Sequence, residues 1–399
     1  MPGSFRYSTI DEAIEATTQH LQPLTETELG TPSLGRVLKV DVKADRDSPA
    51  ADVSAMDGYG AMASQLAKLG PLAVNAESIC GSAPPEITEG GVIRIFTGAI
   101  VPQGCDVVIR REDVVESGDA IEWSEAARKM RLGSNIRRQG ENLKAGDVIA
   151  RRGDILTATG NAALTNFGIN QVSLFPRIKV GLVTTGDEVV DTTTEIQPWQ
   201  LRNSNATGLM NLLSSPRFAI ERAEHATDSE NELREIAEDV IEQCDVLLLT
   251  GGVSMGDYDY VPKIISDMEG EVIFHRLPIR PGKPLFVAHW REKLIVGLPG
   301  NPVSALVNAR RFVVPMLEYL GGVVSFNRCS SLVSVDDLVE TDLPLHRLLL
   351  VRCDEHSMRL VPSKGSGDLV AMSRSDGFVE VPIGWMEGQA VRYFSWQVG

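Results

Sequence analysis

The segment LLLTGGVSMGDYDYV places a glycine turn and acidic side chains directly after an apolar run. Gly251 and Gly252 would let backbone amides approach an anion, and Ser254 would add a hydroxyl donor. The carboxylates of Asp257 and Asp259 could hold a divalent cation, because hard cations prefer oxygen ligands. A double glycine after a strand is also typical of an ordinary tight turn. The segment is therefore a candidate site for a phosphate and its metal ion, with a plain turn as the alternative.

A second loop, GLPGNPVSALV, follows another apolar run. Its prolines and glycines, Pro299 and Gly300 among them, favour an unusual fixed backbone before a predicted helix over residues 303–317. Because a helix N-terminus stabilises negative charge, this loop also indicates a phosphate-like ligand. Asn301 could be a helix cap, but capping alone does not require the rigid Pro-Gly-Asn-Pro run. We expect both loops to face one anionic ligand.

Between the two loops, the segment IRPGKPLFV carries two cations. Pro281 and Gly282 would hold Arg280 and Lys283 close together, and two fixed cations suit a small tetrahedral oxyanion. The alternative is a solvated basic turn. That alternative is disfavoured because the chain has a net charge of -16 and the turn lies between two candidate anion loops.

Two further acidic sites lie at predicted strand boundaries. Asp187 and Glu188, in TTGDEV, end the first strand of the central region, where an open parallel sheet places its ligands. They are acid–base or metal-binding candidates, although an exposed strand-end carboxylate is the commoner outcome. Asp57, in SAMDGYG, begins a β-rich stretch and taken alone predicts only a turn.

The elements that must position these residues alternate between apolar strands and amphipathic helices from residue 178 to about residue 320. This alternation is typical of a parallel sheet covered on both faces. Strands are predicted over residues 178–183, 246–249 and 294–296, and helices begin near residues 206 and 229, with Ser204 and Asn205 as a cap for the first.

The flanking regions differ in texture from this α/β core. Residues 10–21 have the apolar spacing of an amphipathic helix. Residues 51–139 consist of short apolar runs broken by glycine and proline, which predicts a small β-rich domain. The residues after Gly322 form short alternating runs typical of a β-barrel or sandwich.

Length and composition narrow the class of protein. A chain of 399 residues exceeds what one core organises, so two to four domains are expected. It shows neither an apolar run of the roughly 18 residues that a membrane helix needs nor a secretory signal, so the cytoplasm is the expected location. The net charge of -16 argues against nucleic acid as a partner.

The remaining residue types exclude other kinds of site. The five cysteines are odd in number, scattered and without a C-x-x-C pair, so we expect reduced and mostly buried thiols rather than disulfides or a zinc knuckle. No two of the six histidines lie at metal-ligand spacing along the chain, so a zinc hydrolase has no support. A G-x-S-x-G elbow is missing, so a serine hydrolase has none either.

Seven motifs, taken together and in order, carry a resemblance to one family. They are SAMDGYG, FTGAIVPQGCDVVIRRE, TTGDEVV, RNSNATGLM, TGGVSMGDYDYV, RPGKP and GLPGNPVSALV. In these motifs the chain resembles the molybdopterin molybdenumtransferases of the MoeA type, which include the E domain of gephyrin. The resemblance runs over nearly the whole sequence.

The resemblance implies an α/β multidomain fold and a homodimer. Its domains would be a discontinuous linker and dimerisation domain, a β-rich inserted domain, a central doubly wound parallel-sheet molybdopterin-binding domain and a C-terminal β-barrel. They correspond to residues 1–50 with 141–176, 51–140, 177–323 and 324–399. The active cleft would lie between the third domain of one subunit and the second domain of its partner, so Asp57 would act across the dimer interface.

The activity implied by the resemblance is insertion of molybdate into adenylylated molybdopterin, with release of AMP. Molybdate would be captured by the two dithiolene sulfurs as the adenylate leaves, assisted by Mg²⁺ or another divalent cation. A preceding adenylyltransferase could hand over the substrate.

The resemblance also assigns roles to the candidate residues. Asp57, Glu188 and Asp259 would be catalytic, and Asp257 would join Glu188 and Asp259 at the metal. The nucleotide and phosphate would be held by Gly251, Gly252, Ser254, Asp187, Pro299, Gly300 and Asn301. Molybdate would be held by Arg280, Lys283 and Ser304, with Arg347 and Ser366 reaching in from the last domain.

Three positions depart from the family pattern. Arg280 stands where a lysine is usual, which preserves the charge but replaces a point donor by a planar fork. Asn142 replaces an acid usually present in its turn, and Ala371 lies near a position that is serine in some members.

Two other functions are weighed against this one. A paralogue that kept the fold could act as a dimeric adaptor, as the E domain of gephyrin does, but a scaffold has no physical need for charges that converge in a cleft. A related enzyme performs the earlier adenylylation, but that activity belongs to an isolated α/β domain without the flanking regions or the DGYG segment.

Overall fold

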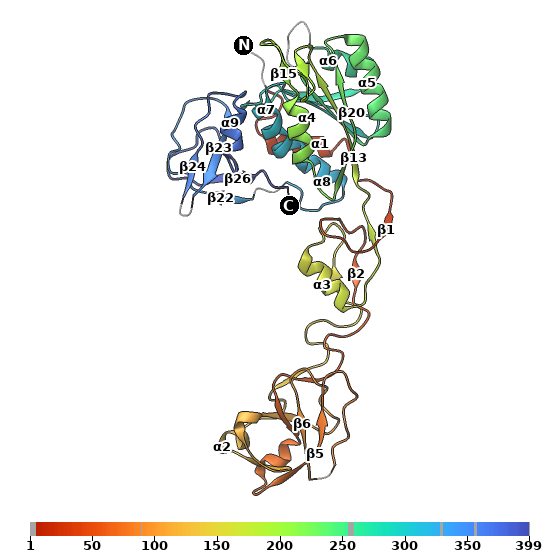
Figure 1. Ribbon diagram of the computed structural model, residues 1–399, viewed down its shortest axis with the longest axis vertical. Coiled ribbons are helices and arrows are strands. Elements are labelled where there is room, and N and C mark those ends of the chain that lie inside the picture. Colours follow the sequence, from red (N-terminus) through yellow and green to blue (C-terminus); the bar gives the residue numbers. More distant parts are fainter. Residues whose placement is uncertain (1–4, 89, 254–258, 328–329, 355–356, 399) are drawn as a thin grey trace. The chain divides into compact units, whose positions relative to one another are not determined.

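The computed structural model describes residues 5–88, 90–253, 259–327, 330–354 and 357–398 (Figure 1). The chain forms two compact units. The large unit comprises Met1–Val40, Arg151–Asn161 and Asn170–Gly399, and the small unit comprises Asp41–Ala150 and Ala162–Ile169. The finer division into four domains stays a prediction.

The large unit is built on a six-stranded sheet. Its order is β16 (Phe218–Ala226), β13 (Ile178–Thr185), β17 (Val246–Thr250), β21 (Lys293–Leu298), β20 (Phe286–Trp290) and β18 (Glu271–His275). The first four strands are parallel, as predicted, while β20 and β18 add an antiparallel edge. The edge is antiparallel because only two residues join β20 to β21, and such a tight hairpin reverses the chain.

Helices cover both faces of this sheet, which confirms the doubly wound architecture (Figure 1). Alternate side chains of β17 show the division. Leu248 packs with α1 (Ile10–Thr18), α4 (Ser204–Leu212), α7 (Pro302–Asn308) and α8 (Val314–Leu320), whereas Leu247 packs with α5 (Glu230–Gln243) and α6 (Val261–Asp267). Burial on both faces explains why the strand sequence is continuously apolar instead of alternating.

Some element boundaries differ from the predicted ones. The opening helix begins after the Thr9 cap but ends at Thr18. The helix predicted over residues 303–317 is α7 and α8 joined by a π-helical turn, η3 (Ala309–Val313). The cap of α4 is Asn203, whose side chain accepts from the Ala206 amide at 3.0 Å.

A buried ion network joins three distant segments at this π-helical turn. The Arg311 side chain is fully buried and pairs with Glu380 at 2.7 Å and with Asp11 of α1. Arg392 also pairs with both acids, with Asp11 at 2.7 Å and with Glu380 at 2.9 Å. Burial raises the pKa of Asp11, but attraction to Arg311 and hydrogen bonds from Asn327 and Arg311 outweigh it and hold that pKa well below its ordinary value.

The second sheet of the large unit is C-terminal. It orders β19 (Ile279–Arg280), β23 (His346–Cys353), β25 (Gly377–Val381), β26 (Val391–Ser395) and β22 (Ser331–Val333), and β24 (Met358–Leu360) pairs with β23. The helix α9 (Leu369–Ser373) precedes β25. Because β19 contains Arg280, the first residue of RPGKP, and pairs with β23, this sheet is connected directly to the candidate cationic turn.

Two short ladders complete the strands of the large unit. They are β1 (Glu28–Gly30) with β12 (Val172–Leu174), and β14 (Val189–Val190) with β15 (Leu201–Arg202). The helix α3 (Ala158–Asn166) spans the boundary between the units.

The small unit is β-rich. Its main sheet orders β7 (Val107–Arg110), β4 (Gly58–Ala61), β6 (Val92–Ile95), β5 (Leu72–Ser78), β9 (Ala120–Trp123) and β8 (Val114–Ser117). Two-stranded ladders pair β2 (Val42–Lys43) with β11 (Val148–Ala150) and β3 (Val53–Ser54) with β10 (Ile136–Arg137). The short helices are η1 (Ala63–Ala67), η2 (Arg111–Asp113) and α2 (Glu125–Arg128). Asn142, the departure from an acid, accepts from Arg137 at 2.8 Å.

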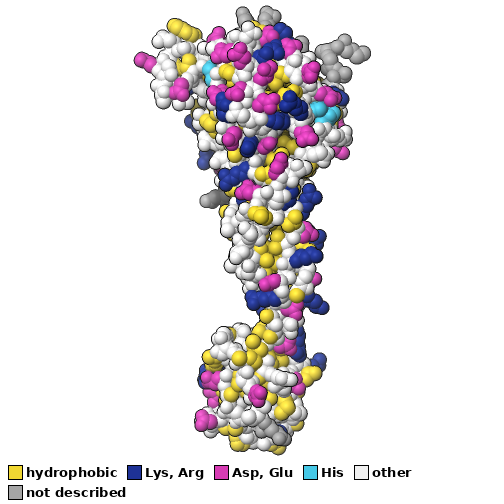
Figure 2. All heavy atoms as spheres, turned by 90° about the vertical axis from the view of Figure 1, so that its right-hand side faces the viewer, with side chains coloured by type: hydrophobic (Ala, Val, Ile, Leu, Met, Phe, Trp, Pro, Cys, Tyr) yellow, Lys and Arg dark blue, Asp and Glu magenta, His cyan; other side chains and the backbone are white. Residues whose placement is uncertain are grey.

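Three further features are the distribution of surface charge, the exposure of the cysteines, and the length and polarity of the helices. Acidic and basic side chains are intermingled on the face of the large unit seen in Figure 2. Of the four described cysteines only Cys244 is buried, so the expectation of mostly buried thiols is wrong. Cys80 and Cys353 are exposed because they lie in a loop and at the end of β23. Among the described residues, every helix is too short or too polar to span a bilayer.

Candidate functional site

The two glycine loops lie side by side at the carboxyl edge of the central sheet. Asn205 of α4 connects them, because its Nδ2 donates to the hydroxyl of Thr250 and to the carbonyl of Gly300, both at 2.8 Å. The Gly251 amide donates to the carbonyl of Leu298 at 3.2 Å. The sheet therefore brings together the segments that the sequence predicted to face one ligand.

The glycines of the first loop are required by its backbone. Gly251 and Gly252 have φ values of +95° and +64°, which L-residues with a side chain rarely adopt. A Cβ on Gly251 would lie 2.4 Å from the Thr185 hydroxyl. The loop thus lies close against the end of β13, and a larger residue at Gly251 would push the two strand ends apart.

The acidic part of this loop is described only in part. Ser254 and Asp257 lie outside the described residues. Asp259 is half-buried, two residues before α6.

The RPGKP turn is held against α7. The Asn308 side chain, which is buried, donates to the carbonyl of Gly282 at 3.0 Å. Gly282 has a φ of +99°, and a Cβ there would lie 2.2 Å from the Asn308 amide nitrogen. The backbone between Arg280 and Lys283 is therefore fixed, while both of their side chains remain exposed.

A pocket of about 800 Å³ opens at this turn. Seven of the predicted substrate-binding residues line it: Arg280, Lys283, Pro299, Asn301, Ser304, Arg347 and Ser366. The residues of the last domain reach it through backbone pairing, because Arg347 is the register partner of Arg280 and the Ser366 carbonyl accepts from the Val303 amide at 3.0 Å. The structure thus places the cationic turn, the second loop and the C-terminal sheet around one cavity.

The charged side chains that line this pocket are all basic among the described residues. Arg280, Lys283 and Arg347 line it, and none of the described lining residues is acidic. Burial lowers the pKa of Arg347, whose guanidinium also donates to the carbonyl of Val339 at 2.8 Å. Ser304 is buried near the start of α7. Such a set of donors suits a small oxyanion.

Asn301 occupies the capping position of α7 without capping it. Its side chain makes no capping hydrogen bond, although its carbonyl accepts from the Ala305 amide at 2.9 Å. The side chain is exposed and lines the pocket. Capping is therefore not what this side chain does, and its amide is available to a ligand.

The strand-end acids stand apart from the lining of the pocket. Asp187 and Asp228 bond reciprocally, each backbone amide donating to the other carboxylate at 3.3 and 3.0 Å. This contact favours the alternative that Asp187 is a strand-end carboxylate that stabilises its loop, rather than an acid–base or metal-binding residue. Glu188 is exposed, and its carboxylate folds back over Gly186.

Asp57 belongs to the small unit and immediately precedes β4. Its Oδ1 accepts from the Thr97 amide at 2.7 Å and from the Thr97 hydroxyl at 2.9 Å. These two hydrogen bonds lower the pKa of Asp57. The side chain is therefore an oriented, ionised carboxylate.

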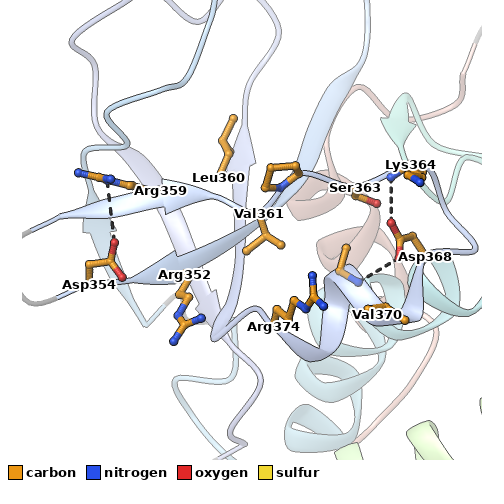
Figure 3. Close-up of a pocket in the computed structure, with 12 residues that line it drawn as sticks. Arg352, Asp354, Arg359, Leu360, Val361, Ser363, Lys364, Asp368, Val370 and Arg374 are labelled. Atoms are coloured by element: carbon orange, nitrogen blue, oxygen red, sulfur yellow. Dashed lines mark hydrogen bonds and ion pairs between the residues drawn. The ribbon is translucent and has the colours of Figure 1, made fainter.

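A second pocket, of about 840 Å³ (Figure 3), shares part of its lining with the first. Residues 360–363 line both cavities. The side chains that give the second pocket its charge are Arg352, Arg359, Lys364 and Arg374, with Asp354 and Asp368. The Asp368 carboxylate is taken up by the amides of Lys364 and Ala371, both at 3.0 Å, so its charge caps α9. Sequence reasoning missed this pocket because its cations are scattered singly along the chain.

Asn205 was predicted to cap a helix but instead connects the two glycine loops. Asn203 provides the cap. The Oδ1 of Asn205 is buried and has no hydrogen-bond partner among the described residues. The repeated asparagines of RNSNATGLM were the available signal, because only one of them could be the cap.

Comparison with known proteins agrees with this geometry. Residues 8–168 match the MoeA N-terminal region, domains I and II, and residues 181–319 match a probable molybdopterin-binding domain. A molybdopterin molybdenumtransferase of Haemophilus influenzae is 33% identical over 318 residues, covering 79% of this chain and 78% of that protein. One from Synechocystis is 28% identical over 96% of this chain and 98% of its own length.

Solved structures extend the likeness to the fold. The crystal structure of the molybdopterin biosynthesis moeA protein from Pyrococcus horikoshii superposes with a TM-score of 0.81. It is 26% identical and the match covers 98% of this chain and 99% of that one. The chain belongs to the molybdopterin molybdenumtransferase family.

Proposed function

We propose that the protein inserts molybdate into adenylylated molybdopterin and releases AMP, as a transferase of molybdenum cofactor biosynthesis. The observation that carries this proposal is the pocket at the RPGKP turn. It presents three cations and no described acid, beside two glycine loops at the edge of the sheet. A site that must hold a tetrahedral dianion next to a phosphorylated pterin needs these two features together.

Within this proposal the pocket binds molybdate. Arg280, Lys283 and Arg347 supply the positive charge, and the hydroxyls of Ser304 and Ser366 supply further donors. Arg280 and Arg347 come from paired strands, so the two guanidinium groups start from fixed backbone positions. The fork of Arg280, where a lysine is usual, can donate two parallel hydrogen bonds to one oxyanion.

The glycine loops hold the nucleotide and phosphate in the same proposal. Gly251, Gly252, Pro299 and Gly300 bring backbone groups to the ligand, and the amide of Asn301 adds a side-chain donor. Ser254 and Asp187 are the remaining predicted contacts. Because Asp187 is already engaged with Asp228, its contribution would be to shape the loop.

The acidic residues fit a hard divalent cation such as Mg²⁺. Glu188 and Asp259 offer carboxylate oxygens near the strand ends, which are the donors that Mg²⁺ prefers, and Asp257 would add a third. When bound, the cation would neutralise charge on the departing adenylate. The chain's own carboxylates then orient the phosphate end of the substrate, while the cationic pocket keeps molybdate beside the dithiolene.

We further propose that the enzyme works as a homodimer in the cytoplasm. The Asp57 carboxylate, held ionised by Thr97, would serve the active site of the partner protomer. Adenylylated molybdopterin would be handed over from an adenylyltransferase, since an activated pterin is exposed to hydrolysis in water. The adaptor alternative is not favoured, because the curated relatives share the name of an enzyme and the cavity is lined for an anion.

The test is direct. Purified protein is incubated with molybdopterin-AMP, molybdate and magnesium, and AMP release is followed together with the formation of active cofactor. We expect AMP release that depends on molybdate and is matched by active cofactor. Protein that forms no cofactor under these conditions, while remaining folded and dimeric, would support the adaptor function instead.

A further inference from the structure

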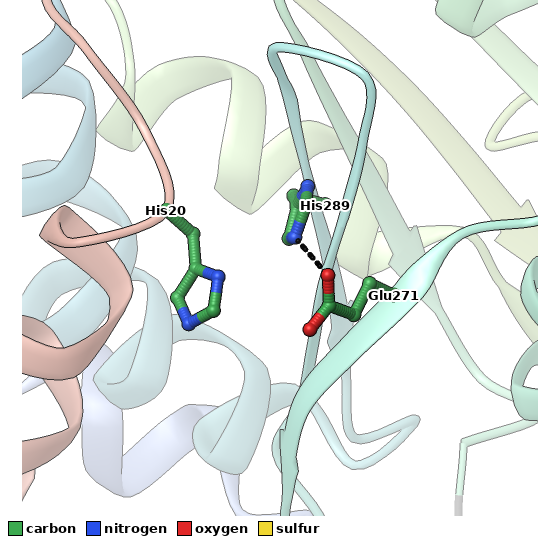
Figure 4. A group of neighbouring side chains, drawn as sticks. All are labelled: His20, Glu271 and His289. Atoms are coloured by element: carbon green, nitrogen blue, oxygen red, sulfur yellow. Dashed lines mark hydrogen bonds and ion pairs between the residues drawn. The ribbon is translucent and has the colours of Figure 1, made fainter.

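His20, Glu271 and His289 meet on the surface of the large unit (Figure 4). His289 pairs with Leu294 near the start of β21, whereas the glycine loop of the proposed active site follows the end of that strand. Each side chain offers one ligand atom, and these three atoms all lie within 4.8 Å of one another. The two histidines are far apart in the chain, so a search of the sequence for closely spaced metal ligands could not find this cluster. Two imidazoles and one carboxylate form a common ligand set for Zn²⁺.

Backbone pairing fixes two of the three ligands. Glu271 and His289 are direct register partners on the antiparallel strands β18 and β20. Directly opposed side chains share one face of a sheet and lie close together. The Glu271 Oε2 and the His289 Nε2 are 3.1 Å apart. Two ligand atoms with bonds of about 2.0–2.1 Å to one tetrahedral zinc ion lie about 3.3 Å apart, so this pair already has nearly the required spacing.

The third ligand comes from a backbone that is also held in place. His20 follows α1, whose residues Ile10 and Ile14 are buried against the central sheet. The Tyr319 hydroxyl lies 3.2 Å from the carbonyl oxygen of Thr18 and 3.1 Å from that of Leu21, on either side of His20. The imidazole itself is exposed, and its ring centroid is 5.1 Å from that of His289. A rotation of this one side chain can close the remaining distance.

The hydrogen bonding of His289 suits a metal ligand. Its Nδ1 lies 3.2 Å from the carbonyl oxygen of Arg291, which is the contact that orients many metal-binding histidines. With the proton on Nδ1, the Nε2 lone pair points at the Glu271 carboxylate.

We propose that His20, Glu271 and His289 bind a divalent transition metal, Zn²⁺ in the first place, with water at the fourth position. The ion links the segment after α1 to the antiparallel edge of the central sheet. Bound metal therefore stabilises the attachment of the N-terminal helix. This site is separate from the Mg²⁺ site proposed for the carboxylates that follow β13 and β17. The two sites would also select different ions, because imidazole nitrogen favours zinc over magnesium.

The test titrates the full-length protein with zinc chloride in the presence of excess Mg²⁺, and measures binding by calorimetry. Co²⁺ is then used as a spectroscopic substitute, because its visible absorption reports nitrogen ligation and coordination geometry. The variants are His20→Asn and Glu271→Gln, both at exposed side chains. The matched control is His225→Gln, an exposed histidine outside the cluster.

We expect one zinc ion per chain at this site and a loss of affinity of more than about tenfold in each ligand variant, because even indirect partners of a metal site contribute 10- to 100-fold. The His225→Gln protein should bind zinc as the wild type does. Zinc should also raise the thermal midpoint of the wild type and not that of His20→Asn. If both ligand variants, shown by circular dichroism to be folded, bind zinc with unchanged affinity and stoichiometry, the proposal is wrong.

Discussion

Replacement of Lys283 by methionine tests whether the pocket at the RPGKP turn binds molybdate. Methionine keeps much of the length of the side chain and removes only the charge and its donors. The turn itself should persist, because its backbone is held by the hydrogen bond from Asn308 to Gly282. The variant therefore separates the charge from the shape of the turn.

The expected magnitude follows from the exposure of Lys283. A hydrogen bond to a charged group contributes about 1.5–3 kcal/mol, which corresponds to about 10- to 150-fold in affinity. Since the side chain is exposed, the lower end applies. We expect the molybdate concentration for half-maximal turnover to rise about tenfold, with the dependence on molybdopterin-AMP little changed. The assay is AMP release at a series of molybdate concentrations.

The control is Arg374→Met, which removes one positive charge from the neighbouring pocket. A cation about 8 Å away, one Debye length at physiological ionic strength, attracts a dianion by only about 0.4 kcal/mol in water. At that separation, the loss of one positive charge changes the molybdate requirement by about twofold. Equal effects of Lys283→Met and Arg374→Met, or an unchanged requirement in Lys283→Met, would refute direct binding of molybdate by Lys283.

Four further variants test other parts of the structure. Asp57→Ala should abolish molybdate-dependent cofactor formation without loss of the dimer, measured by light scattering; undiminished activity would remove Asp57 from the mechanism. Asn205→Ala should lower the free energy of unfolding by about 1–2 kcal/mol and weaken binding of molybdopterin-AMP, since two hydrogen bonds between the glycine loops are lost; an unchanged denaturation midpoint would contradict this. Arg311→Met should lower the free energy of unfolding by about 3–5 kcal/mol, because it removes the fully buried partner of Glu380 and leaves that buried acid paired with Arg392 alone. Because the pKa of Asp11 is lowered on folding, its contribution is complete above the ordinary pKa of about 3.9 and is lost as the pH falls below it, so Asp11→Asn should show a smaller loss of stability on acidification than the wild type.

The loops at the strand ends could be predicted because their signals are local. Gly251 and Gly252 need positive φ, and the Pro-Gly-Asn-Pro run around Asn301 fixes its own backbone. Parallel strands all end at one edge of the sheet, so finding β13, β17 and β21 in the sequence was enough to bring their loops together. The parallel topology alone therefore predicted that these loops lie close together, without any knowledge of side-chain contacts.

Contacts that depend on pairing between distant strands were not predictable in the same way. The segments that form β20 and β18 are short and apolar, and nothing local in their sequence distinguishes an antiparallel edge strand from a parallel one. The opposition of Glu271 and His289 depends on that register, so the cluster with His20 was invisible in the sequence. The same holds for Arg280 and Arg347, which only the resemblance to a family placed in one site.

An acidic chain can still hold an anion, because net charge and local charge act over different distances. The charge of -16 is spread over the surface and is screened beyond about 8 Å at physiological ionic strength. It repels extended polyanions, which must approach many of these charges at once. In the proposed site, a small oxyanion would lie in a pocket lined by Arg280, Lys283 and Arg347, and none of the described lining residues is acidic. Raising the ionic strength should therefore weaken molybdate binding, since screening reduces the attraction of nearby cations as well as the distant repulsion, and the nearby cations dominate.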